Sequence, residues 1–105
     1  WNTPDSVTTI CQFAFSNCCK LRKILISPNS QLRSIEKEAF YKTSIRSLKI
    51  PSHLTFIDES AFSSSFYLTL IEIDENSELT NFDYKIFENI YGVIIYTSVM
   101  FIKNF

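Results

Sequence analysis

Apolar residues recur along the chain with a period of 22 to 25 residues. The repeat is marked by four dipeptides that end in Phe, namely Ala14-Phe15, Ala39-Phe40, Ala61-Phe62 and Ile86-Phe87. Two further apolar columns stand seven and four positions ahead of each dipeptide, and they hold Val7, Leu32, Leu54 and Leu79, then Ile10, Ile35, Ile57 and Phe82. A fixed period of this length is the sequence signature of a repeat architecture.

A second motif follows each dipeptide and alternates apolar with intervening positions. Its copies are Leu21-x-x-Ile24-x-Ile26, Ile45-x-x-Leu48-x-Ile50, Leu68-x-x-Ile71-x-Ile73 and Ile90-x-x-Val93-x-Ile95. Alternation at every second residue is typical of a β-strand with one buried face. We therefore predict strands near residues 23–27, 47–51, 70–74 and 93–96, stacked side by side in one parallel sheet.

The first motif of each copy is expected to return the chain across the opposite side. Residues 36–40 suit a short helical turn that directs Phe40 inward, with a small Ala39 where neighbouring coils pack closely. One coil cannot bury its apolar side alone, but stacked coils can. The pattern predicts a solenoid with a single buried column formed by Phe15, Phe40, Phe62 and Phe87.

These repeats define one domain over residues 1–105. We place four repeats near residues 7–31, 32–53, 54–78 and 79–98, with partial repeats at both ends. Asn29-Ser30-Gln31-Leu32 recurs as Asn76-Ser77-Glu78-Leu79, 47 residues later. The turn at Pro51 between them is shorter and resembles the turn at Pro4, so long and short turns alternate.

The combined motif, Leu-x-x-Ile-x-x-x-Ala-Phe followed by Leu-x-x-Ile-x-Ile-Pro, resembles the BspA-like leucine-rich repeat, best over residues 32–51 and next best over 54–73. The resemblance implies a right-handed leucine-rich repeat solenoid of about four repeats, with parallel strands on one face and short helical turns or strands on the return face. It also implies a segment of a large surface or secreted protein of bacteria or mucosal protists, for which adhesion is the role usually proposed. Members often carry a Cys three residues after the Phe. Only Cys18 does so here, so we expect no cysteine ladder.

Composition and charge narrow the possible functions. Hydrophobic residues make up 46% of the chain, too many for a disordered segment, and the one Gly excludes a glycine-rich phosphate loop. Residues 1–52 hold eight basic and three acidic residues, whereas residues 53–105 hold two and eight. Because the basic residues are spread over two repeats, we predict no nucleic-acid partner. The longest apolar stretch, near residues 93–102, is shorter than the roughly 20 residues of a membrane span.

Few groups suit catalysis or metal binding. His53 lies in a turn, where we expect it to be solvated, and the same holds for Asp74, Glu75 and Glu78, which lack the dense oxygen ligands of a calcium loop. The three cysteines, Cys11, Cys18 and Cys19, lie too close together for a disulfide framework and too far from His53 for a zinc site. We expect them to be small buried hydrophobic residues. The sequence thus predicts no enzyme, no cofactor and no metal site.

The remaining candidate site is the outward side of the predicted strands. The residues that we choose for a protein-binding face are Lys23, Leu25, Lys49, Leu70, Glu72 and Ile94. A row that mixes apolar and charged side chains on a concave sheet suits protein recognition better than catalysis. A merely solvated strand face is an equal alternative.

Two functions stay open at this point. The first is a protein-binding segment of a cell-surface or secreted adhesion or antigen-type protein, with a host or matrix protein as its partner; it rests on the resemblance and the outward row. The second is a cytoplasmic scaffold of the same architecture, which the free thiols and the absence of an Asn-x-Ser/Thr sequon favour.

Overall fold

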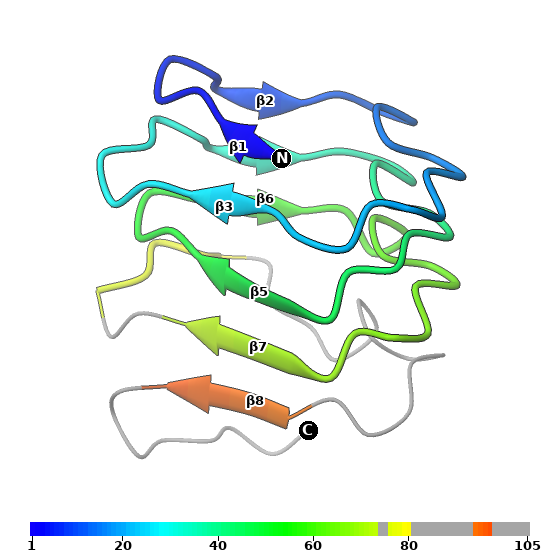
Figure 1. Cartoon of the computed structure of the whole chain (residues 1–105). Helices are drawn as coiled ribbons and strands as arrows, with labels where there is room; N and C mark the ends of the chain where they lie inside the picture. The colour runs from blue at the N-terminus through cyan, green and yellow to red at the C-terminus, as the bar shows by residue number, and fades with distance from the viewer. Residues whose placement is uncertain (74–75, 81–93, 98–105) are drawn as a thin grey trace.

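The chain winds into a stack of coils in the computed structural model, which describes residues 1–73, 76–80 and the backbone of 94–97. The described strands are β1 (Asn2–Thr3), β2 (Thr9–Ile10), β3 (Leu25–Ile26), β4 (Ser34–Ile35), β5 (Ser47–Ile50), β6 (Phe56–Ile57), β7 (Leu70–Ile73) and β8 (Ile94–Thr97). In Figure 1, β1, β3, β5, β7 and β8 lie one below another, and we call this the strand side. The other strands form the return side.

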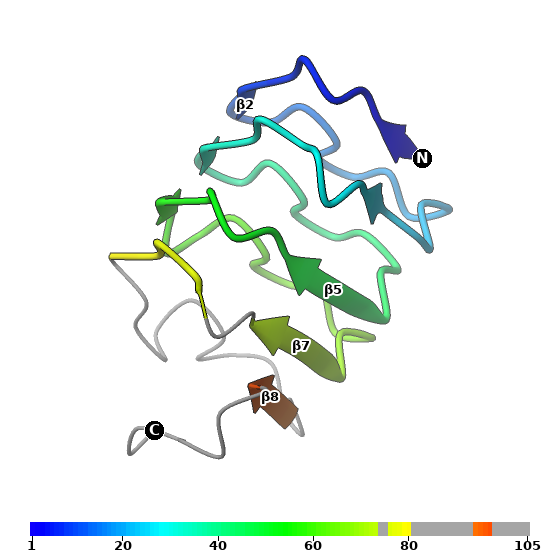
Figure 2. The same ribbon diagram turned by 90° about the vertical axis from the view of Figure 1, so that its left-hand side faces the viewer.

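The described strands pair in parallel with their counterparts in the next coil, except that β3 does not pair with β5, so that each crossover between paired strands is one turn of a solenoid. The return side holds the sheet β2-β4-β6, and the strand side holds the sheets β1-β3 and β5-β7-β8. Figure 2 shows the two sides apart, with β2 at one edge and β5, β7 and β8 at the other. The predicted solenoid, with parallel strands stacked on one face and strands on the return face, is confirmed. The prediction of one continuous sheet on the strand side is wrong, because β3 does not pair with β5 and two sheets result.

The register between β5 and β7 is the one that the repeat predicts. Leu48 pairs with Ile71 and Lys49 pairs with Glu72, so the inward and outward positions of the two copies coincide. In β5 the burial alternates strictly, because successive side chains of a strand point to opposite faces.

The alignment of the fourth copy is wrong by two residues. We matched Val93 to Ile71, but β8 pairs Ile95 with Ile71. Ile94 therefore does not lie beside Glu72, as the row of outward residues implied. A shift of two residues leaves every residue on the same side of the sheet, because the side-chain period of a strand is two. The outward register position of Ile94 is unchanged.

The segment after β4 forms successive turns instead of the expected helical turn. The backbone N–H of Ala39 donates to the carbonyl of Glu36 at 3.2 Å, and that of Tyr41 donates to Glu38 at 3.2 Å. Glu38 and Lys42 have φ values of 51° and 55°. A residue with a positive φ cannot continue a right-handed helix. The segment therefore forms separate turns, each closed by a hydrogen bond between residues three positions apart.

The same left-handed position recurs in neighbouring coils. Asn17 and Ser64 are the counterparts of Lys42, and their φ values are 63° and 60°. With the turns in the same conformation, their backbones bond from coil to coil: the N–H of Phe15 donates to Ala39 at 2.8 Å, and that of Phe40 donates to Ala61 at 2.8 Å.

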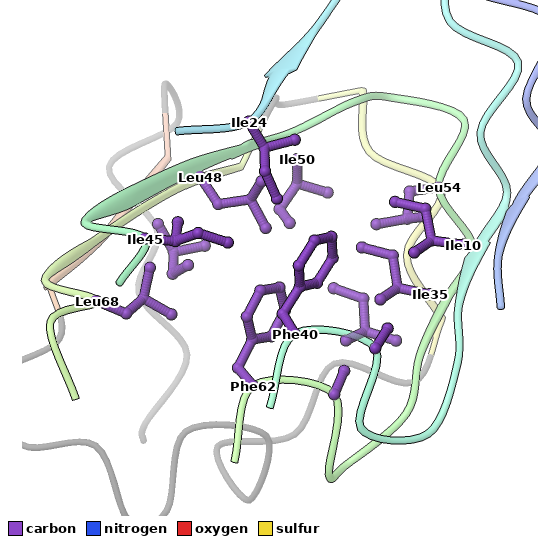
Figure 3. Close-up of a cluster of buried hydrophobic side chains, with 14 of the residues drawn as sticks. Ile10, Ile24, Ile35, Phe40, Ile45, Leu48, Ile50, Leu54, Phe62 and Leu68 are labelled. Carbon is purple, nitrogen blue, oxygen red and sulfur yellow. The ribbon is translucent and has the colours of Figure 1, made fainter. Parts of the chain in front are cut away.

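The core lies between the strand side and the return side (Figure 3). Phe40 and Phe62 are fully buried at its centre, and burial of a Phe side chain contributes about 1.5–3 kcal/mol. Phe15 is partly buried and stacks on Phe40, with ring centroids 5.4 Å apart. The predicted Phe column is confirmed for these three residues, and Phe87 lies outside the described residues.

A ladder of hydroxyl groups occupies the position where the family often has Cys. Thr43 and Ser65 are buried there, with their hydroxyl oxygens 3.1 Å apart, and the Ser65 hydroxyl donates to the carbonyl of Phe40. The expectation that the cysteines are buried is wrong, because Cys11, Cys18 and Cys19 are all exposed. Cys18 shares its column with Thr43, but its coil has a described neighbouring turn on one side only.

The alternation of long and short turns has a direct structural basis. In the long turns, the hydroxyl of Ser30 accepts a hydrogen bond from Leu32 N at 3.1 Å, and that of Ser77 accepts one from Leu79 N at 3.2 Å. In the short turns, the carbonyls of Pro4 and Pro51 each accept a bond at 3.1 Å from the backbone three residues later.

Candidate ligand-binding face

The outward residues of the strand side differ in how far they reach into solvent. Lys23, Leu25 and Lys49 are exposed, whereas Leu70 and Glu72 are partly buried. Leu25 is 50% exposed, which is high for a leucine that sits in the middle of a repeat. Ile94 pairs with Leu70 in the register of β7 and β8, and its side chain lies outside the described part of the chain. We call the outward surface of β3, β5 and β7 the strand face.

A depression of about 330 Å³ lies on the strand face at the point where the sheet is interrupted. Among the described strands, β3 pairs with β1 and β5 pairs with β7, and no ladder joins β3 to β5. The depression lies beside this interruption. Its lining is Asn2, Thr3, Ile24, Leu25, Ile26, Ser27 and Lys49. Thus Leu25 and Lys49, two of the predicted face residues, border one hollow.

Thr3 adds an unsatisfied polar group to this lining. It is 5% exposed, and its hydroxyl oxygen has no hydrogen-bond partner among the described residues. A buried hydroxyl without a partner costs about 1–3 kcal/mol of stability. Because this oxygen is itself buried, the accessible lining of the depression is mainly apolar, with Lys49 as its one charged residue.

A second, smaller hollow of about 200 Å³ lies where the chain approaches the strand side, and Arg22, Ser44, Arg46 and Tyr67 line it. Sequence reasoning missed it, because none of these residues stood out by type. One signal was available: Arg22 follows Leu21 and Arg46 follows Ile45, so that the two arginines occupy the same position of successive repeats. We call this second hollow the arginine corner.

The other sequence candidates do not form a catalytic group among the described residues. His53 is 54% exposed in its turn, as expected, and its Nδ1 lies 3.6 Å from a carboxylate oxygen of Glu78. No cluster of three His, Cys, Asp or Glu side chains that suits a metal ion occurs in the described part of the chain. Asp74 and Glu75 lie outside it. Within the described ranges no helix is long and apolar enough to cross a membrane.

The comparison with known proteins matches the whole repeat pattern. A family model described as a BspA type leucine rich repeat region matches residues 1–104 in six copies. The chain belongs to the BspA-type leucine-rich repeat family. This confirms the resemblance that the Ala-Phe and Leu-x-x-Ile-x-Ile motifs carry.

A solved structure is similar to this BspA-type array. It is a leucine-rich cell surface protein from Faecalibacterium prausnitzii A2-165, which is 31% identical with a TM-score of 0.65. The match covers 73% of this chain and 19% of the other one. The chain therefore corresponds to about a fifth of that surface protein. No curated protein matches the chain significantly.

Proposed function

We propose that this BspA-type array is a protein-binding module of a cell-surface protein, and that the strand face binds the partner. The observation that carries the proposal is the half-exposed Leu25 at the rim of a depression that it shares with Lys49. Protein interfaces depend on a few residues that become fully desolvated in such pockets. Leu25 is an apolar residue that a partner could desolvate, and the adjacent Lys49 could pair with an acidic group of that partner.

The face residues proposed for contact are Lys23, Leu25, Lys49, Leu70, Glu72 and Ile94. Their mixture of apolar and charged groups supports protein recognition, since interface cores exclude charge and interface rims are polar. Leu25 would anchor the partner, and the charged residues would align it.

The surface location rests on similarity. The related structure is that of a cell surface protein, and the family match covers nearly the whole chain. A repeat segment of such a protein has no need of its own active site, because its extended face supplies many small contacts. We propose a host or matrix protein as the partner.

An intracellular scaffold is the second candidate, and the exposed thiols of Cys11, Cys18 and Cys19 favour it. Free exposed thiols persist in reducing compartments and are oxidised outside the cell. Labelling of intact cells with an amine-reactive reagent that does not cross membranes separates the two locations, because lysine amines stay reactive in oxidising and in reducing compartments. Labelling of the parent protein supports the surface location, and labelling only after lysis supports the scaffold.

The binding proposal is tested by replacing one apolar residue of the strand face with a charged residue, next to a matched control. Leu25→Glu places a charge at the rim of the depression, whereas Phe66→Glu changes a residue that is 63% exposed in the turn before β7. Both variants are assayed against immobilised matrix proteins and host cells. We expect Leu25→Glu to weaken binding by about 2 kcal/mol or more and Phe66→Glu to have little effect. Equal binding by both variants would contradict the assignment of the strand face.

A further inference from the structure

Two arginines from neighbouring coils, Arg22 and Arg46, line the arginine corner. Arg22 and Arg46 are held close because the coils are bonded beside them: Ser44 N donates to the carbonyl of Leu21 at 2.9 Å, and the Ser44 hydroxyl donates to the carbonyl of Cys19. The backbone positions of the two arginines are therefore fixed relative to one another by the solenoid itself.

The next coil fixes Arg46 further. Its carbonyl accepts hydrogen bonds from the N–H of Thr69 at 2.9 Å and from the Thr69 hydroxyl at 3.2 Å. Its guanidinium carbon lies 5.9 Å from the ring centroid of Tyr67, within the range of a cation–π contact. The ring of Tyr67 thus forms one wall of the corner and holds the guanidinium beside it.

The corner is rich in positive charge, and the sequence on either side of its two arginines holds no carboxylate. Residues 6–35 contain Lys20, Arg22, Lys23 and Arg33 and no Asp or Glu, and residues 39–57 contain Lys42, Arg46 and Lys49 and no Asp or Glu. Within the described residues, neither arginine of the corner has a carboxylate at ion-pair distance. Like charges that face one another on adjacent strands or coils destabilise a fold. An anion bound between the two arginines would remove this repulsion.

The lining selects the chemistry of the anion. A guanidinium group can donate two parallel hydrogen bonds to a pair of oxygens of a carboxylate, sulfate or phosphate group, and the exposed Tyr67 offers a hydroxyl donor. The Ser44 hydroxyl already donates its proton to Cys19, so its role is to hold the coils together. Unlike the depression at Leu25, this corner has no aliphatic wall into which a protein side chain could insert.

We propose that the arginine corner binds the sulfate or carboxylate groups of an acidic glycan, with Arg22 and Arg46 as the anion ligands. The neighbouring Lys20 and Lys23 extend the positive surface along the same coil, so that a linear chain of charged sugars would meet more than one cation. Tyr67 would contact the sugar ring next to the charged group. This is a different ligand class from the protein partner of the strand face, and its two anion ligands, Arg22 and Arg46, are not among the residues proposed to contact that partner.

The test measures binding of the whole chain to a short heparin fragment by titration calorimetry at low salt. Arg22→Gln combined with Arg46→Gln removes two charges from the corner. The matched control, Arg33→Gln combined with Lys37→Gln, removes two charges from exposed residues outside the corner, and circular dichroism checks that both variants fold. We expect the corner variant to lose about tenfold or more in affinity, which corresponds to one charge-assisted hydrogen bond, and the control to lose about twofold or less.

Two outcomes would overturn the proposal. Equal losses in the corner variant and in the control would show that overall charge, and not the corner, attracts the glycan. A glutamate-rich peptide or a single-stranded oligonucleotide that binds as tightly, with the same dependence on Arg22 and Arg46, would show that the ligand is not a glycan. A third variant, Arg22→Lys with Arg46→Lys, keeps the charge but removes the two-pronged geometry. Its affinity should fall between wild type and the Gln variant.

Discussion

The rings of Phe40 and Phe62 lie nearly parallel, with centroids 5.3 Å apart and an interplanar angle of 10°. The two residues come from successive coils, 22 positions apart in the sequence, and both are fully buried. The spacing of the rings is close to that of neighbouring strands in a sheet, about 4.8 Å. Each ring therefore packs on the next, and the column links the coils through the centre of the core.

Removal of either ring should be among the most damaging single changes in the array. We expect Phe40→Ala and Phe62→Ala each to lower the free energy of unfolding by about 3–5 kcal/mol, because each leaves a cavity that its neighbours cannot fill. Urea denaturation followed by circular dichroism measures this. Phe66→Ala is the control, since Phe66 is largely exposed. An equal loss in the control would mean that the column does not hold the coils together.

The buried hydroxyl ladder should be sensitive to loss of one oxygen. Ser65→Ala removes the donor to the Phe40 carbonyl and leaves the Thr43 hydroxyl without this partner in a buried site. We expect a loss of about 1–3 kcal/mol of stability, the cost of an unsatisfied buried polar group. Ser63→Ala, in the same turn but only partly buried, should cost less in the same denaturation assay. The reverse order would contradict a structural role for the ladder.

The left-handed residue Lys42 allows a test of the turn conformation. At a φ of 55°, Lys42→Gly should leave stability unchanged within about 1 kcal/mol, whereas Lys42→Val should cost about 1–2 kcal/mol because a branched side chain clashes there. Lys37 lies in the same turn without a positive φ, so Gly should be no better than Val at that position. Thermal melts compare the four variants. The same ranking at both positions would indicate a different turn.

His53→Ala should change stability very little. The His53 and Glu78 side chains are 54% and 51% exposed, and even a fully charged pair at such exposed positions contributes only about 0–1 kcal/mol. A thermal melt alongside Phe40→Ala checks this, and a larger effect of His53→Ala would overturn the repeat assignment together with the solvated role of His53.

The sequence predicted the parts of the fold that the repeat period determines. The Phe column, the β5–β7 register and the alternation of long and short turns all follow from residues that recur at matched positions, since successive coils pack in the same way. The register of β8 was not predictable in this way. Residues 93–96 are apolar at every position, so the pattern cannot distinguish two alignments that differ by two residues.

Less of the candidate site than of the fold could be predicted from the sequence. The exposure of Cys18 depends on which coils lie beside it, and the type of residue does not reveal this. The depression at Leu25 arises because β3 and β5 do not pair, although their sequence motifs are alike. The arginine corner needs three coils in place, because Tyr67 joins it from the coil after Arg46. The alternation of apolar and polar residues predicts which side chains point outward. It does not predict the hollows between them, because these depend on which strands pair.

The register of Lys49 beside Glu72 provides the sharpest test of charge recognition on the strand face. The first 52 residues have a net charge of +5 and the remaining 53 a net charge of −6, so Lys49 and Glu72 belong to parts of the sequence with opposite net charge. Lys49→Glu combined with Glu72→Lys reverses this local order without changing the net charge or the core. A partner whose charges are complementary to Lys49 and Glu72 should bind the swapped variant more weakly than the wild type. This difference in affinity should shrink as salt screens the charges.

The control for this swap keeps the net charge and moves the change elsewhere. Lys37→Glu combined with Glu59→Lys alters two exposed residues in the turns after β4 and β6. Once a matrix protein or host-cell ligand is found, surface-binding assays at low and high salt compare wild type with both double variants. We expect only the Lys49 and Glu72 swap to weaken binding at low salt, because Lys37 and Glu59 do not belong to the strand face. Equal binding by all three proteins would exclude these charges from the site. Loss of binding in the control alone would move the site to the turns and leave the fold assignment intact.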